Sequence, residues 1–381
     1  MAQLFIELFS EEIPSKLQID ARQKIRQMIE EKLQKKEIGF ESSKSFSTPK
    51  RLVFFTDGIP EKIEQKKKVI KGPKVGAPQS ALDGFIKSNN LLMEDIYKKN
   101  IDKGEFYFAE SKLKTIDILN ELKSIIPEVL QSYSWKKSMK WSVHNLSWGR
   151  PLKSIIALLN NKVINFTFFH IQSSNLTFID GIKEEQTRKI NSFKSYLSIL
   201  KSQNIILNQE ERKNIIIKRM NSICNSRGLK SSFNEKLIEE VVNLVEKPNV
   251  ILGKFNEIYL KIPQEILIVT MQQHQKYFPL FSENNKLTNL FFIVANLPDK
   301  KGYIKIGNQR VIEARLSDAK FFWEKNKTQN LVKQISKLKN LSFFNQLGSF
   351  YDRTQRLRKL SSPVSDQLNI SKEKVEIASS I

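Results

Sequence analysis

The sequence of 381 residues contains a single cysteine, Cys224, which lies within a helical pattern. One thiol can form neither an intramolecular disulfide nor a cysteine-ligated metal cluster, so we expect a buried, unreactive side chain. No run of about 18 uncharged apolar residues occurs, and no membrane span is therefore predicted. The N-terminus begins directly with an alternating segment rather than a secretory signal. Together these absences favour the cytoplasm as the location.

Acidic residues are few beside the basic ones. Lys and Arg number 63 against 40 Asp and Glu, which gives a net charge of +23. A charge of this size favours a polyanionic partner, most simply a nucleic acid. However, Lys outnumbers Arg by 50 to 13, and AT-rich coding alone would produce part of this excess. The charge is compatible with RNA binding but does not establish it.

Common signatures of catalysis are also missing. The sequence has no Gly-rich phosphate loop, no metal-ligand spacing and no triad pattern, so no catalytic and no metal-binding residues are predicted. What is present indicates a folded chain, since 40% of the residues are hydrophobic and the length allows two or three domains.

The apolar pattern predicts a mixed fold. Leu4, Ile6 and Leu8 indicate a strand buried on both faces, and a helix opens near Pro14 with apolar residues spaced along one face. Strands and helices then follow one another without a regular βαβ rhythm. We predict a multidomain α+β fold with mixed sheets and packed helices.

Changes in composition suggest three regions. Residues 1–172 are expected to form an N-terminal α+β region, subdivided near residues 60–80, where a charged segment is either a solvated loop or an RNA contact. Residues 173–330 are expected to form a second α+β domain. From residue 331 to 381 the pattern is helical and basic, which predicts the start of a helical domain.

Two stretches near the end are dense in side chains that hydrogen-bond, stack or carry charge. Met271–Pro279 joins a predicted helix to a predicted hairpin, and Gly307–Phe322 contains a predicted helix. Asn308, Arg315 and Asp318 would share one stripe of that helix, beside an apolar stripe. An Arg315–Asp318 pair would brace the fold. The aromatic residues at 321–323 follow the apolar stripe and are expected in the core.

These stretches belong to an ordered series of sequence blocks. The blocks are Leu8–Pro14, Thr48–Leu52, Gly72–Pro73, Ala81–Phe85, Met139–Trp141, Gly149–Leu152, Glu239–Pro248, Met271–Pro279 and Gly307–Phe322. In content and order they resemble the β subunit of bacterial two-subunit glycyl-tRNA synthetases, over most of the chain.

The resemblance implies a partner and a division of labour. It implies an α subunit that binds ATP with Mg²⁺ and forms glycyl-adenylate, an α2β2 assembly, and a β chain that binds tRNA(Gly) and holds no cofactor of its own. The fragment alone would be inactive. Candidate contacts with RNA or with the partner subunit are Lys50, Arg51, Lys140, Trp141, Arg150, His274, Lys276, Asn308, Arg310 and Arg315.

The sequence departs from the family in two ways. The family has a Gly-His-Arg-Phe element where this chain reads Asn175–Leu176–Thr177–Phe178, and relatives continue beyond Ile381 with helical and anticodon-binding parts. The chain is therefore expected to be a fragment. An alternative is a stand-alone RNA-binding or assembly module without ligase activity. An independent hydrolase using His274 is disfavoured, because no Asp or Glu is placed locally to assist it.

Overall fold

The computed structural model describes residues 1–64, 69–101, 104–110, 115–180 and 185–380. It forms two compact units. The first contains Met1–Ile251 and Ile293–Lys301, and the second contains Leu252–Phe292 and Gly302–Ile381. The boundary predicted near residue 173 therefore falls inside the first unit. The mixture of helices with small sheets confirms the predicted α+β class.

The first unit is built on a sheet in which the strand order is β13–β14–β11–β1–β3–β2, with β12 beside β11. Its strands are β1 (Ala2–Ser10), β2 (Ser42–Thr48), β3 (Arg51–Ile59), β11 (Leu152–Leu159), β12 (Lys162–Val163), β13 (Thr167–Phe168) and β14 (Ile171–Ser174). In the register, Leu8 of β1 lies opposite Leu52 on one side and Ile155 on the other. β1 is antiparallel to both neighbours, whereas β14 runs parallel to β11.

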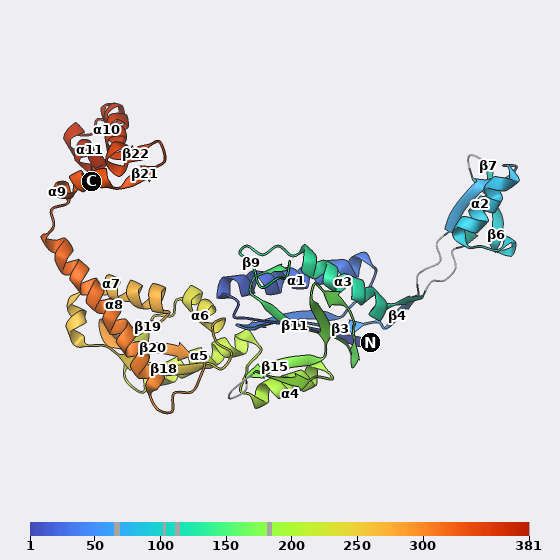
Figure 1. Cartoon of the computed structure of the whole chain (residues 1–381), viewed down its shortest axis with the longest axis horizontal. Helices are drawn as coiled ribbons and strands as arrows, with labels where there is room; N and C mark the ends of the chain where they lie inside the picture. Colours follow the sequence, from blue (N-terminus) through green and yellow to red (C-terminus); the bar gives the residue numbers. More distant parts are fainter. Residues whose placement is uncertain (65–68, 102–103, 111–114, 181–184, 381) are drawn as a thin grey trace. The chain divides into compact units, whose positions relative to one another are not determined.

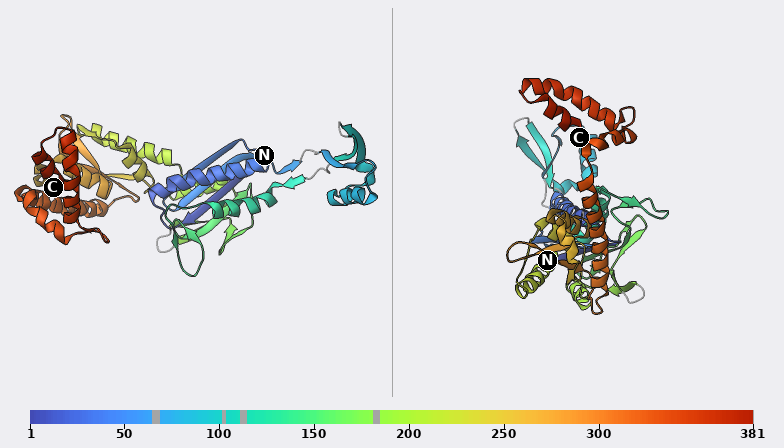
Figure 2. Two further views of the ribbon diagram at one scale, coloured as in Figure 1. Left: turned by 90° about the horizontal axis from the view of Figure 1, so that it is seen from above. Right: turned by 90° about the vertical axis from the view of Figure 1, so that its left-hand side faces the viewer.

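Side chains of β1 are buried on both faces of this sheet, as predicted. Leu4, Ile6 and Leu8 join a core formed with α1 (Ser15–Lys35) and α3 (Ile118–Ser132). Phe5 points to the opposite face and packs in a second core with α4 (Phe193–Ser202). Figures 1 and 2 show α1 and α3 together on one side of the sheet, and Figure 1 shows α4 on the other. Period-two alternation explains how one strand supplies both cores.

Helix α1 follows from its apolar spacing. Pro14 precedes its first turn, and residues three to four apart are buried on one face, among them Leu17, Ala21 and Ile25. Lys32 and Lys35 lie in the last turn, where positive charge is favoured by the helix dipole.

Shorter elements complete the first unit. They are β4 (Lys62–Glu64), β8 (Thr115–Asp117), β9 (Met139–Lys140), β10 (Ser147–Trp148), β15 (Leu176–Asp180), β16 (Glu185–Lys189), α5 (Gln209–Asn225), β17 (Leu229–Ser231) and α6 (Glu235–Val242).

A small sheet lies within residues 69–110, and the subdivision of the N-terminal region was predicted near residues 60–80. It contains β5 (Val69–Lys74), β6 (Ile96–Ile101) and β7 (Gly104–Glu110) in the order β5–β7–β6, with α2 (Gln79–Asn89) and η1 (Met93–Asp95). A Cβ at Gly72 would lie 2.8 Å from the Phe85 ring, so two of the sequence blocks meet here and glycine is required. Residues 65–68 of the charged segment lie outside the described residues.

The predicted hairpin is formed by β19 (Phe278–Ser282) and β20 (Leu287–Ala295), with β18 (Asn249–Lys254) beside β20. Strand β19, residues 287–292 of β20 and residues 252–254 of β18 belong to the second unit. Its helices are η2 (Glu257–Lys261), α7 (Gln264–Val269), the π-helical η3 (Thr270–His274) and α8 (Tyr303–Thr328). Ile312 and Leu316 of α8 are fully buried, which confirms the apolar stripe predicted for this helix. Phe278 of β19 and Phe292 of β20 are fully buried as well.

The last part of the chain is mostly helical. It contains α9 (Leu331–Gln334), η4 (Ile335–Asn340), the short hairpin of β21 (Ser342–Phe344) and β22 (Gly348–Ser349), α10 (Phe350–Gln367) and α11 (Lys372–Ser380). Among the described residues of the whole chain, no helix is both long and apolar enough to cross a membrane.

Candidate functional site

A buried ion-pair network lies at the centre of the first unit. The Arg51 side chain, 2% exposed, donates from Nε to Glu7 Oε1 at 3.1 Å and from Nη1 to Glu246 Oε2 at 3.0 Å. Its Nη2 donates to the carbonyl oxygen of Phe178. One guanidinium therefore links β1, β3, β15 and the segment after α6. The planar fork of arginine suits such multiple contacts.

Glu7 receives further hydrogen bonds in the same network. The hydroxyls of Tyr196 and Thr177 donate to its Oε1 at 2.8 Å and 3.0 Å. Burial raises the pKa of the Glu7 carboxyl, and the positive charge of Arg51 opposes that rise. Burial also raises the pKa of Tyr196 well above its usual value, so its hydroxyl keeps the proton that it donates. The cluster is closed to solvent and is a structural network.

The segment that reads Asn175–Leu176–Thr177–Phe178 reaches into this network. Thr177 is fully buried and bonded to Glu7, and Phe178 supplies the carbonyl oxygen for Arg51 while its ring stacks on Phe9 at 5.2 Å. In this chain the segment 175–178 thus supports the buried pair with a hydroxyl and an aromatic ring.

A second polar network lies beside the first. Arg212 is fully buried, and its guanidinium donates to four backbone carbonyls, those of Ser47, Ile206, Leu207 and Val242. Burial lowers the pKa of Arg212 to about 10, which leaves it charged at neutral pH.

Asparagine side chains hold the neighbouring backbone in place. Asn243 Oδ1 accepts from Arg22 Nη1 at 3.0 Å, and Asn296 Oδ1 accepts from the backbone N–H groups of Glu246 and Lys247 at 2.8 and 2.9 Å. Two of the sequence blocks, at 48–52 and 239–248, therefore meet in one polar interior with Glu7, and the ring of Phe9, from block 8–14, lies 4.8 Å from the Arg51 guanidinium.

For Arg51 this geometry revises the expected role. Its guanidinium was predicted to contact RNA or a partner subunit, but it is enclosed and bonded on all three nitrogens. The neighbouring Lys50 is half-buried, and its carbonyl accepts from Ser10 N–H at 2.9 Å. The acidic partners of Arg51 lie 44 and 195 positions away, so the local basic sequence predicts a surface position.

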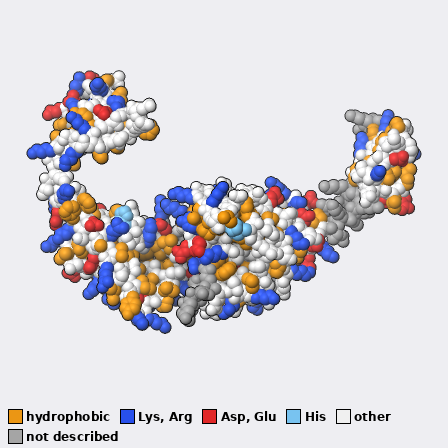
Figure 3. All heavy atoms as spheres, viewed as in Figure 1, with side chains coloured by type: hydrophobic (Ala, Val, Ile, Leu, Met, Phe, Trp, Pro, Cys, Tyr) orange, Lys and Arg blue, Asp and Glu red, His pale blue; other side chains and the backbone are white. Residues whose placement is uncertain are grey.

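On the surface of the first unit lies an aromatic and basic cluster. The rings of His144 and His170 stack with centroids 3.5 Å apart and planes inclined by 5°, and Trp141 meets His170 edge-on at 6.2 Å. Lys140 is exposed, and Arg150 is half-buried with Nη1 donating to Gly149 O. Figure 3 shows Lys and Arg side chains spread over the face in view, with hydrophobic side chains between them.

Of the ten predicted residues, Lys140, Trp141 and Arg150 lie in this part of the chain, whereas His144 and His170 were not predicted as site residues. Twenty-six positions separate His170 from His144, so no local spacing could have paired them. Trp135, six positions before Trp141, is 8% exposed and packs edge-on against Trp148 at 5.1 Å. A Cβ at Gly149 would lie 2.5 Å from the Trp135 ring, so that block requires glycine for packing.

In the second unit the two late sequence blocks meet directly. The Tyr277 hydroxyl donates to Asn308 Oδ1 at 2.6 Å, and Asn308 Nδ2 donates to Ile304 O at 2.7 Å. Tyr277 is buried and stacks on Phe291, and burial raises its pKa to about 12. Asn308 therefore joins the hairpin to α8.

His274 lies at the exposed end of η3, and Lys276 has a left-handed backbone with φ +58°. Such π-helical turns are frequent at functional sites. Arg310 and Arg315 are exposed on α8, as is Asp318. RNA or subunit contact by these residues stays a prediction.

One packing prediction for α8 is wrong. Phe321 and Phe322 were expected in the core, yet they are 59% and 57% exposed. The buried stripe of the helix ends near Leu316, so the next turns present their aromatic rings to solvent. Cys224, in contrast, is buried as predicted, and burial raises the pKa of its thiol.

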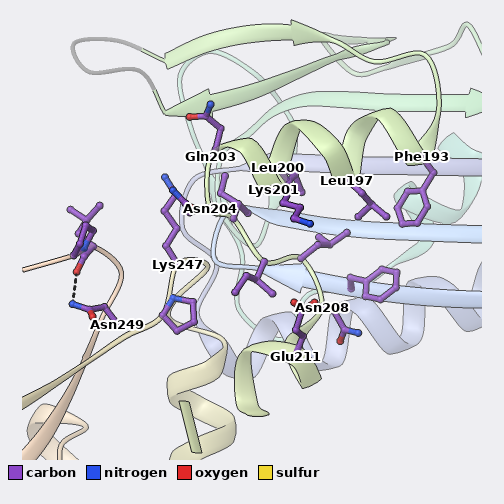
Figure 4. A pocket seen from close by; sticks show the side chains of 17 residues that line it. Phe193, Leu197, Leu200, Lys201, Gln203, Asn204, Asn208, Glu211, Lys247 and Asn249 are labelled. Atoms are coloured by element: carbon purple, nitrogen blue, oxygen red, sulfur yellow. Dashed lines mark hydrogen bonds between the residues drawn. The ribbon is translucent and has the colours of Figure 1, made fainter. Parts of the chain in front are cut away.

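The first unit also has a cavity of about 980 Å³, shown in Figure 4. Phe193, Leu197 and Leu200 of α4 form one wall, and Lys247 and Asn249 line the opposite part. Among the described residues that line it, none is one of the ten predicted site residues. Within the described parts of the chain, no group of three or more His, Cys, Asp or Glu side chains could hold a metal ion.

The fold and these sites define an α+β protein whose sequence blocks assemble into polar interiors and a basic surface. The family described as "Glycyl-tRNA synthetase beta subunit" matches residues 4–381 of the sequence. This chain belongs to that family.

Individual relatives carry the corresponding name. The chain is 36% identical to "Glycine--tRNA ligase beta subunit" of Clostridioides difficile (strain 630), over 98% of this chain and 55% of the relative. It is 32% identical to the protein of that name in Rickettsia felis, over 95% of this chain and 55% of the relative. It is 31% identical to the protein of that name in Rhodospirillum centenum, over 99% of this chain and 57% of the relative. The chain thus spans about half the length of the curated relatives it matches.

Proposed function

We propose that this chain is the N-terminal portion of a glycine–tRNA ligase β subunit, which binds and positions tRNA(Gly) for ATP-dependent glycylation. The observation that carries the proposal is the family match over residues 4–381. In this proposal the chemistry lies in a partner α subunit, which holds ATP and Mg²⁺ and forms glycyl-adenylate. The β chain acts in the cytoplasm within an α2β2 assembly.

Positioning alone is a substantial contribution to such a reaction. Fixing a terminal ribose hydroxyl against an activated glycine removes part of the entropic barrier, about 7–11 kcal/mol at best. The net charge of +23 supports binding to the phosphate backbone of tRNA. Surface groups proposed to take part are Lys50, Lys140, Trp141, Arg150, His274, Lys276, Arg310 and Arg315.

The test is tRNA(Gly) charging with ATP and [¹⁴C]glycine. The α subunit would be assayed alone, with this chain, and with a version extended past Ile381 to the length of the relatives. We expect charging only when both subunits are present, and most with the extended version. The proposal fails if the extended version gives no charging while the α subunit still forms adenylate in pyrophosphate exchange.

A stand-alone RNA-binding or assembly module is the second candidate. It is favoured by the replacement of the Gly-His-Arg-Phe element, because Thr177 and Phe178 are occupied in the buried network. Purification with a tagged α subunit separates the candidates, since only a ligase β subunit is expected to remain bound to it at stoichiometric ratio.

A further inference from the structure

The cluster of Trp141, His144 and His170 has a rigid support. It stands on two turns, one after β9 and one between β13 and β14, where Phe169 has φ +54°. β9 pairs with β10 through Met139 opposite Trp148, and the buried Trp148 packs edge-on against Phe168 of β13 at 5.7 Å. Both turns are therefore anchored to the same residue, Trp148, one through its backbone and one through its indole, which fixes the relative positions of the three surface rings.

The rings are presented to solvent. His170 is exposed, Trp141 and His144 are half-buried, and the neighbouring Phe169 is 48% exposed. Partial burial, and then the charge of His144, lower the pKa of His170 below its usual value. At neutral pH His170 is therefore an uncharged flat ring at the edge of an existing stack.

The sequence that carries the stack has charges of one sign. From Val129 to Ile179 the sequence contains no Asp or Glu. The basic side chains in that range are Lys136, Lys137, Lys140, Arg150, Lys153 and Lys162. Lys136 pairs with Asp20 and Lys153 with Glu11, whereas Lys137 and Lys140 are exposed beside the rings in the sequence. Flat rings next to cations are the chemistry that binds unpaired bases and their phosphates.

We propose that Trp141, His144 and His170 form a stacking platform for an unpaired base of single-stranded RNA, with Lys137 and Lys140 contacting the adjoining phosphates. This rests on the proposed function, because it specifies how the β chain holds a single-stranded part of tRNA. Duplex RNA hides its base faces, so the platform distinguishes single strands from helices.

The test uses the full 381-residue chain and two fluorescein-labelled probes, a single-stranded oligoribonucleotide (rA8) and a blunt duplex RNA of the same length. We expect His170→Ala to weaken rA8 binding roughly tenfold, within the range of about 5- to 150-fold that loss of one stacked base gives, and to change duplex binding by less than about twofold. His170→Phe keeps a flat ring and should restore rA8 binding. Trp141 fluorescence should be quenched by rA8.

Phe233→Ala is the matched control, since it removes a partly exposed aromatic ring elsewhere in the unit. Thermal unfolding of each variant checks the fold. Equal rA8 affinities for His170→Ala and the parent chain would overturn the platform. So would an equal loss for both probes, or a loss of α-subunit binding with RNA binding unchanged, which would make the cluster a protein contact.

The outcome is separable from that of the proposed function. If the chain supports charging with the α subunit but His170→Ala binds rA8 normally, the ligase assignment stands and the platform is refuted. Platform-dependent rA8 binding without any charging would retain the platform and remove the ligase assignment.

Discussion

Replacing Arg51 by Met tests the buried ion-pair network most directly. The substitution keeps an extended apolar stem but removes the only guanidinium placed between Glu7 and Glu246 in the described structure. Removing one partner of a buried ion pair costs about 3–5 kcal/mol, because the remaining charge stays buried without compensation. Here two carboxylates and the carbonyl of Phe178 lose their donor, so we expect a loss at the upper end of that range.

The loss should depend on pH in a defined direction. Burial already raises the pKa of Glu7, and removing Arg51 takes away the charge that opposes the rise. Folded Glu7 would then bind a proton more readily than the unfolded chain, whose Glu has a pKa of about 4.3. The variant should therefore recover stability relative to the parent as the pH falls from 7 toward 5.

The assay is urea unfolding followed by tryptophan fluorescence, since Trp135 and Trp148 lie in the core of the first unit. Lys44→Met is the matched control, because it removes an exposed cation from the neighbouring strand and should change stability by less than about 0.5 kcal/mol. A loss below about 1 kcal/mol for Arg51→Met, with no dependence on pH, would refute the reasoning.

Three further predictions concern single contacts. Asn296→Ala removes the acceptor of two backbone N–H groups and should lower the free energy of unfolding by about 1–3 kcal/mol in the same urea assay, with no effect if water replaces the amide. Tyr277→Phe removes the hydroxyl bonded to Asn308 and should cost about 1 kcal/mol, measured by the melting of the second unit, whereas an unchanged melting temperature would contradict the link between the two blocks. Because the pKa of His170 is lowered in the folded chain, the contribution of this side chain to stability is complete above pH 6.5 and declines as the pH falls below that value. In a plot of melting temperature against pH, His170→Asn should therefore have a smaller slope below pH 6.5 than the parent chain, and an identical slope would exclude the effect.

Periodicity predicted the parts of the fold that depend on local pattern. The spacing of apolar residues indicated β1, the face of α1 and the buried stripe of α8, and all three are present. The order of the sequence blocks identified the family, because a family resemblance depends on the sequence alone and needs no tertiary contacts.

The buried network could not be predicted in the same way. Arg51 follows Lys50 and looks like part of a basic surface, while Glu7 and Glu246 lie 44 and 195 positions away. Only tertiary packing brings these charges together. Tertiary packing likewise brings His144 and His170 into contact. Phe321 and Phe322 were wrongly predicted in the core, because the apolar pattern of a helix does not show how far along the helix other elements pack against it.

The composition of the first unit has a consequence for its synthesis. Asn296 belongs to this unit although the chain reaches it only after passing through all of β18, β19 and β20. A ribosome that has delivered residues 1–251 has supplied Arg51 and Glu246 but not the amide that fixes the backbone of Glu246. The polar interior of the first unit therefore becomes complete only after the hairpin of β19 and β20 has been synthesised. Part of the second unit is thus made before the first unit has all of its residues.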